Sequence, residues 1–137
     1  MADKNDFGMI VTPNRENIEE LLHGAVDMHV HIAPDSTVVR RCDALETAIA
    51  AQEYGMRGYV AKSFFYPTTV VAAACKHVAP EVDVFGSVVI GYAQTAGLDN
   101  AAYVIDTHAK IGCKMVWFPA FDSRNCKQGL GQEGGIV

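Results

Sequence analysis

Two histidines one residue apart are the first residues in this chain whose types and spacing could do chemistry. They are His29 and His31 in the stretch VDMHVHIAPDS, and Asp27 stands two residues before them. Side chains alternate between the faces of a β-strand, so we expect Asp27, His29 and His31 to share one face. The pattern predicts that both imidazoles bind a divalent metal, with zinc expected first and manganese, iron or nickel as alternatives. Asp27, deeper on the same face, is the expected hydrogen-bond partner behind them. The alternative is two histidines satisfied by backbone groups or water.

Three cations complete the predicted site. Lys62, in YVAKSFFYP, lies near the end of an apolar run. A buried, unpaired ammonium is costly, so we expect Lys62 to reach a solvated mouth, where it could bind an anionic substrate, act as the catalytic base or carry a metal-binding carbamate. Arg40 and Arg41 follow the first strand and could bind a substrate carboxylate or phosphate. The alternative for both arginines is a solvated loop.

Alternating strand and helix patterns must position these residues. Apolar strands are expected in AVDMHVHI, GYVAKSFF, VDVFGSVVIGY and KMVWFPAF, and helices in CDALETAIAAQEYGM, PTTVVAAACKHVA and DNAAYVIDTHAKIG. The strands recur roughly every thirty residues, which is the size of a βαβ unit. The predicted class is therefore α/β, with four parallel βα repeats that form half of a (β/α)8 TIM-type barrel. An open doubly wound sheet is the alternative.

The expected organisation has three parts. Residues 1–23 form a lead-in with a short helix, residues 24–122 form the (β/α)4 half-barrel, and residues 123–137 form a Gly-rich tail that is an interrupted βα loop. Four parallel strands leave two sheet edges unpaired. We therefore expect either that a C-terminal half is missing from this chain or that the half-barrel associates with a second copy.

Composition narrows the class of partner. The chain has 137 residues and a formal net charge of -5, which argues for one domain and against a nucleic-acid partner. No apolar run is long enough to span a membrane, and MADKNDFG lacks the apolar stretch of a signal peptide. The four cysteines include no C-x-x-C pair and are expected to be thiols. A cytoplasmic protein with a small-molecule substrate is the expectation.

The stretch VDMHVHIAPDS resembles the first-strand signature D-x-H-x-H of the amidohydrolase superfamily, which are metal-dependent hydrolases on a (β/α)8 barrel. The resemblance implies that His29 and His31 bind a metal that activates water for attack on a small-molecule amide, ester or related bond. It covers the first strand, and the later strands share only the βα rhythm. The superfamily's other ligands come from later strands, and Pro119 stands on the fourth strand where a ligand is expected. The chain by itself is therefore expected to lack a complete site.

Three other functions are compatible with the sequence. A metal-dependent decarboxylase would use the same scaffold. A non-catalytic half-barrel would act through self-association or as part of a larger assembly. A small doubly wound ligand-binding domain would explain the βα rhythm, but it would leave the shared face of Asp27, His29 and His31 without a purpose.

Overall fold

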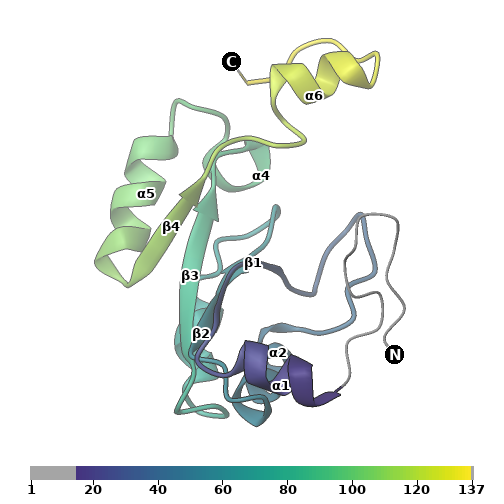
Figure 1. Cartoon of the computed structure of the whole chain (residues 1–137). Coiled ribbons are helices and arrows are strands. Elements are labelled where there is room, and N and C mark those ends of the chain that lie inside the picture. The colour runs from purple at the N-terminus through teal and green to yellow at the C-terminus, as the bar shows by residue number, and fades with distance from the viewer. Residues whose placement is uncertain (1–14, 137) are drawn as a thin grey trace, which may run out of the picture.

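Four parallel strands form one sheet in the computed structural model, which describes residues 15–136 (Figure 1). They are β1 (Val26–His31), β2 (Gly58–Lys62), β3 (Asp83–Val89) and β4 (Cys113–Trp117), and they lie in the order β1-β2-β3-β4. A doubly wound sheet reverses its strand order part of the way across, whereas a (β/α) barrel adds each strand beside the last. The predicted α/β class with parallel βα repeats is confirmed, and the strand order is consistent with half of a barrel.

Helices connect the strands as predicted, with differences at their ends, and an unpredicted short helix, α4, begins at Tyr92, where the third strand was expected to end. They are α1 (Arg15–Leu22), α2 (Ala44–Glu53), α3 (Thr69–Cys75), α4 (Tyr92–Thr95), α5 (Ala101–Lys110) and α6 (Arg124–Gly129). The capping box expected at α2 is present, because Asp43 accepts from the Glu46 amide and Glu46 accepts from the Asp43 amide. No helix within residues 15–136 is long and apolar enough to cross a lipid bilayer.

The start of α3 and the presence of α6 differ from the sequence prediction. We expected the helix after β2 to open at Pro67, but α3 begins at Thr69. Thr68 is held by the sheet instead, since its hydroxyl donates to the Ala61 carbonyl at 2.7 Å and its amide donates to the Ser87 carbonyl at 3.0 Å. The tail, expected as a loop throughout, contains α6 beyond the end of β4 (Figure 1).

Helix α6 forms because its first turn is capped. The Ser123 hydroxyl accepts from the Cys126 amide at 3.2 Å, and it lies directly before the helix. The Arg124 amide donates to the Ile136 carbonyl at 2.8 Å, which returns the chain to the start of the helix. The high glycine content of this segment led to the prediction of a loop. The helix is instead stabilised by the Ser123 cap and by the backbone hydrogen bond to Ile136.

The main core lies between the sheet and helices α2 and α3. Its buried members come from α2, β2, the end of α3, the residue after β1 and the turn between α3 and β3: Ile32, Ala44, Ala48, Ala51, Tyr59, Ala61, Cys75, Ala79 and Val82. Small alanines on the helices allow close approach to the strands. The Tyr59 hydroxyl donates to the Ala44 carbonyl at 2.6 Å, and burial raises the pKa of Tyr59, which keeps it a neutral donor.

The opposite face of the sheet is concave. The rings of His29 on β1 and Trp117 on β4 lie 4.6 Å apart, although two strands separate them. In a flat sheet three inter-strand steps would place the two backbones about 14 Å apart. The sheet must therefore curve strongly toward this face, as the sheet of a barrel does. Met28 on this face is 53% exposed, so the described residues leave much of it uncovered.

Gly86 in β3 provides a test of the packing between sheet and helix. A Cβ atom at Gly86 would lie 2.4 Å from Thr69 Cα at the start of α3. We expect Gly86→Ala to destabilise the fold by about 1–3 kcal/mol, because backbone must move to admit the methyl group. Gly129→Ala in α6 is the control, since a Cβ there meets no atom within 4 Å. Urea unfolding of both variants measures the difference, and equal midpoints would contradict this account.

Candidate functional site

The carboxyl ends of three strands bring the candidate residues together. His31 is the last residue of β1, Lys62 the last of β2 and Trp117 the last of β4. His31 and Lys62 are register partners across the first strand pair. This edge of a parallel sheet is where the active sites of (β/α) barrels lie. The predicted convergence of His29, His31 and Lys62 is therefore present.

A bulge in β1 decides which side chains face this site. Asp27 pairs with Tyr59 in β2 and Val30 pairs with Ala61, so β1 carries one more residue than β2 over this stretch. The Asp27 carboxylate accepts a hydrogen bond from the backbone amide of His29 at 2.9 Å, inside the bulge. The extra residue interrupts the alternation on which the sequence prediction relied.

Asp27 consequently does not share a face with the two histidines, and that expectation was wrong. Asp27 lines a cavity with Val30, Tyr59 and residues of α2, on the helix side of the sheet. Met28, the next residue, lines a cavity with Val60 on the concave side. Asp27 hydrogen-bonds to the His29 backbone amide and to neither imidazole ring, and its negative charge acts to raise the pKa of His29.

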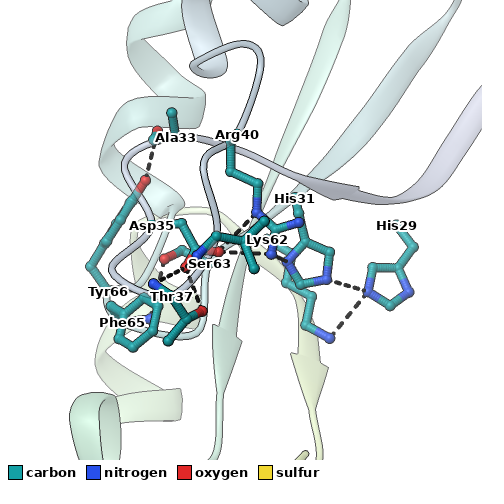
Figure 2. A network of polar contacts seen from close by, with 11 residues as sticks. His29, His31, Ala33, Asp35, Thr37, Arg40, Lys62, Ser63, Phe65 and Tyr66 are labelled. Atoms are coloured by element: carbon teal, nitrogen blue, oxygen red, sulfur yellow. Dashed lines mark hydrogen bonds and ion pairs between the residues drawn. The ribbon is translucent and has the colours of Figure 1, made fainter.

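The two imidazoles face each other directly. His29 Nε2 and His31 Nε2 lie 3.2 Å apart, and Lys62 Nζ lies 3.1 Å from His29 Nε2 (Figure 2). Partial burial and the Lys62 charge lower the pKa of His29, while partial burial and the charges of Arg40 and Lys62 lower that of His31. Burial also lowers the pKa of Lys62. The histidines are therefore neutral near pH 7 and available as ligands.

Arg40 is held by a buried carboxylate. Its Nη2 lies 2.7 Å and its Nε 2.8 Å from Asp35 Oδ2, and the Asp35 side chain is only 4% exposed. Arg40 Nη2 also lies 3.5 Å from His31 Nδ1. A guanidinium can only donate, so Nδ1 is the acceptor in this contact. A continuous chain of contacts thus runs from Asp35 through Arg40, His31 and His29 to Lys62 (Figure 2).

This geometry separates the two arginines that were predicted to bind substrate. Arg40 is engaged by Asp35 and positions the ring of His31, so its charge is already balanced. Arg41 is exposed, and it makes no hydrogen bond or ion pair with the described part of the chain. The structure therefore gives Arg40 a role in support of His31 that sequence spacing did not indicate.

Aromatic rings surround the polar groups. The Trp117 ring lies 4.6 Å from that of His29, and the Phe64 ring lies 4.9 Å from that of His31. Lys62 Nζ lies 4.5 Å from the Trp117 ring centroid and 4.7 Å from that of Phe64, within the range of cation–π attraction. Sequence reasoning missed both rings. The position of Trp117 at the end of a predicted strand was the available signal.

The two facing nitrogens suit a shared metal ion. Their separation of 3.2 Å is less than twice the usual Zn–N distance of about 2.0–2.1 Å, so one ion can contact both at an angle of about 100°. Within residues 15–136 no group of three or more His, Cys, Asp or Glu side chains is placed to hold a metal. The donor set therefore fits part of a metal site, and further ligands must come from water, substrate or residues outside this group.

Asp35 provides a test of the support behind His31. Burial alone would raise the pKa of Asp35, but hydrogen bonds from Thr37, Arg40 and Val38 outweigh it and hold the pKa well below its usual range. We expect Asp35→Asn to cost about 2 kcal/mol of unfolding free energy, because bonds to a charged acceptor are lost. A carboxyl whose pKa is lowered on folding stabilises the fold fully above its unfolded pKa of about 3.9, and loses that contribution as pH falls through the folded value.

The difference between wild type and Asp35→Asn should therefore be largest at neutral pH and shrink in acid, as measured by urea unfolding across pH. Asp106→Asn is the control, because its ion pair with Lys110 is exposed and contributes little. A difference that stays constant from pH 7 to acid would contradict the assigned role of the Asp35 charge.

Comparison with known proteins identifies a family and no activity. Residues 24–136 match the family model DUF6282, which is described as a family of unknown function. No curated protein matches the chain. No solved structure matches it either. The match spans both histidines, all four strands and helix α6. The chain belongs to the DUF6282 family.

Proposed function

We propose that this chain carries the first two ligands of an amidohydrolase-like, metal-dependent hydrolase site that acts on a small-molecule amide, ester or related bond. The facing Nε2 atoms of His29 and His31, 3.2 Å apart at the carboxyl edge of a parallel sheet, are the observation that supports it. Zinc is the first candidate, and manganese, iron and nickel are alternatives. A bound divalent ion would lower the pKa of its water and polarise the scissile carbonyl.

The chain's own residues prepare the ligands. Asp35 and Arg40 hold the ring of His31, and the Trp117 ring packs on that of His29, so neither imidazole has to be ordered on binding. A metal binds the neutral imidazole, so a proton that converts either ring to imidazolium competes with the metal. Metal affinity should therefore fall in acid, where the two rings become charged.

Lys62 is the proposed catalytic residue. Its ammonium lies 3.1 Å from His29 Nε2, at the same edge of the sheet as the ligands. Because burial lowers its pKa, Lys62 gives up a proton more readily than an exposed lysine. It is placed to contact a substrate bound beside the two histidines, either as a cation that binds an anionic group or as a group that transfers a proton.

The ligand assignment is tested by metal affinity. We expect His29→Ala and His31→Ala each to weaken Zn²⁺ binding by about 100-fold or more, because loss of even an outer hydrogen-bond partner typically costs about 10–100-fold. Isothermal titration with Zn²⁺, repeated across pH, measures both the affinity and the proton released. His77→Ala is the control, since His77 is exposed and lies outside the site. Unchanged Zn²⁺ affinity in both site variants would refute the assignment.

Self-association is a second candidate function, supported by the concave face. Within the described residues β1 and β4 each pair with one strand only, and Met28 of β1 is half exposed on the concave face. A second copy related by a two-fold axis would place β1 beside the partner's β4 and extend the parallel sheet to about eight strands, the number that side chains can fill. Such an assembly would close the site at its open side.

The four free thiols fit the reducing cytoplasm, where we place the protein.

Solution mass tests the assembly. If two copies close a barrel, light scattering after size exclusion should give a dimer, and Met28→Asp should shift it to monomer because a buried carboxylate would lack a partner. Val39→Asp is the control, because Val39 is 99% exposed and lies in the loop after β1. A monomer in the unmodified protein, or a dimer that tolerates Met28→Asp, would contradict this arrangement.

A further inference from the structure

Lys62 carries a charge that the described structure does not balance. The residue is 5% exposed, and its hydrogen-bond partner is the neutral ring of His29. No carboxylate within residues 15–136 pairs with it, in contrast to Arg40, which is paired with Asp35. Attraction to the Trp117 and Phe64 rings offsets only part of the cost of burying an ammonium. The site therefore has a place for an anion.

Trp117 supplies a second donor without an acceptor. Its Nε1 is buried and donates to no atom of the described structure. Buried N–H groups are nearly always paired in folded proteins, so an unpaired one requires an explanation. The ring of Trp117 lies 4.5 Å from Lys62 Nζ, which places both donors on the same side of the sheet. One carboxylate has enough acceptor positions to satisfy the two together.

An apolar cavity lies beside Phe64, the ring that Lys62 contacts. Its volume is about 190 Å³, and Phe64, which contacts both Lys62 and His31, forms one wall. The remaining lining is mostly apolar and comes from the loop after β2, the end of β3, helix α4 and the segment after β4, where Phe121 and Asp122 lie. The Asp122 carboxylate is engaged, because it accepts from the Tyr92 amide at 2.8 Å. An apolar cavity of about 150 Å³ is known to hold benzene, so a ring-sized group fits here.

We propose that the site takes a small carboxylate with an apolar, ring-sized body. The carboxylate accepts from Lys62 Nζ and Trp117 Nε1, and the body occupies the cavity walled by Phe64 and Phe121. This inference rests on the proposed function only in naming the substrate class of the same site. The contacts that it uses involve no metal, so the carboxylate binds metal-free protein as well.

The test uses the tryptophan as its own reporter. The chain contains one tryptophan, so intrinsic fluorescence reports on Trp117 alone. Chelator-treated protein is titrated with benzoate, with the neutral isostere benzamide and with acetate. Benzoate should give a saturable change with an affinity at least about tenfold above those of benzamide and acetate, since only benzoate offers both the charge and the ring.

Variants separate the charge from the fold. Lys62→Met should abolish the preference for benzoate over benzamide, and Lys62→Arg should retain it because the charge remains. Lys110→Met, which removes an exposed lysine on α5, should change nothing. Equal binding of benzoate and benzamide by the unmodified protein overturns the proposal, as does an unchanged preference in Lys62→Met.

The two proposals fail separately. A benzoate preference in a protein that does not bind Zn²⁺ would refute the metal site and leave the carboxylate site standing. Zn²⁺ binding through His29 and His31 without a benzoate preference would refute the carboxylate site and leave the metal site standing. If Lys62→Met does not fold, the comparison of the three ligands on unmodified protein and on Lys62→Arg still decides the question.

Discussion

The bulge in β1 is the constraint on which the candidate site depends. A strand that kept strict alternation from Asp27, which faces the helices, would turn His29 and His31 toward the helices as well. The added residue between Asp27 and Val30 reverses the alternation, so that apolar residues still pack under α2 while both imidazoles reach the concave face. The Asp27 carboxylate stabilises the bulge by accepting from the His29 amide. The bulge thus lets one strand place apolar side chains against the helices and both imidazoles on the concave face.

Charge is distributed unevenly around the two histidines. Asp35 neutralises Arg40 on one side, in a loop held by further bonds to the same carboxylate, so this side is rigid and balanced. Lys62 on the other side meets only neutral groups and aromatic rings. The imidazoles therefore lie between a fixed support and an unbalanced cation. Burial and the nearby cations keep both rings neutral, and the unbalanced Lys62 leaves one direction from which an anion gains by binding.

Curvature of the sheet places Trp117 of β4 beside His29 of β1. Trp117 reaches His29 from the far edge strand because four parallel strands bend around a common axis. Hydrogen bonds between the strand ends support this bend: the Gln94 side chain donates to the Ser63 carbonyl and accepts from the Val89 amide. The same curvature leaves Met28 on a partly open face. The site and the uncovered surface thus have one structural cause.

The sequence by itself determined the features that depend on neighbours along the chain. The βα rhythm, the parallel class, the α2 capping box at Asp43 and the pairing of His29 with His31 on one face all follow from local periodicity and local hydrogen bonds. Only the tertiary structure decided the remainder. Asp27 faces the helices because of the strand register, and Arg40 is paired with Asp35 because that carboxylate is buried beside it. Trp117 lies beside His29 because the sheet is curved. Those properties arise between segments distant in sequence, and no periodicity within one segment encodes them.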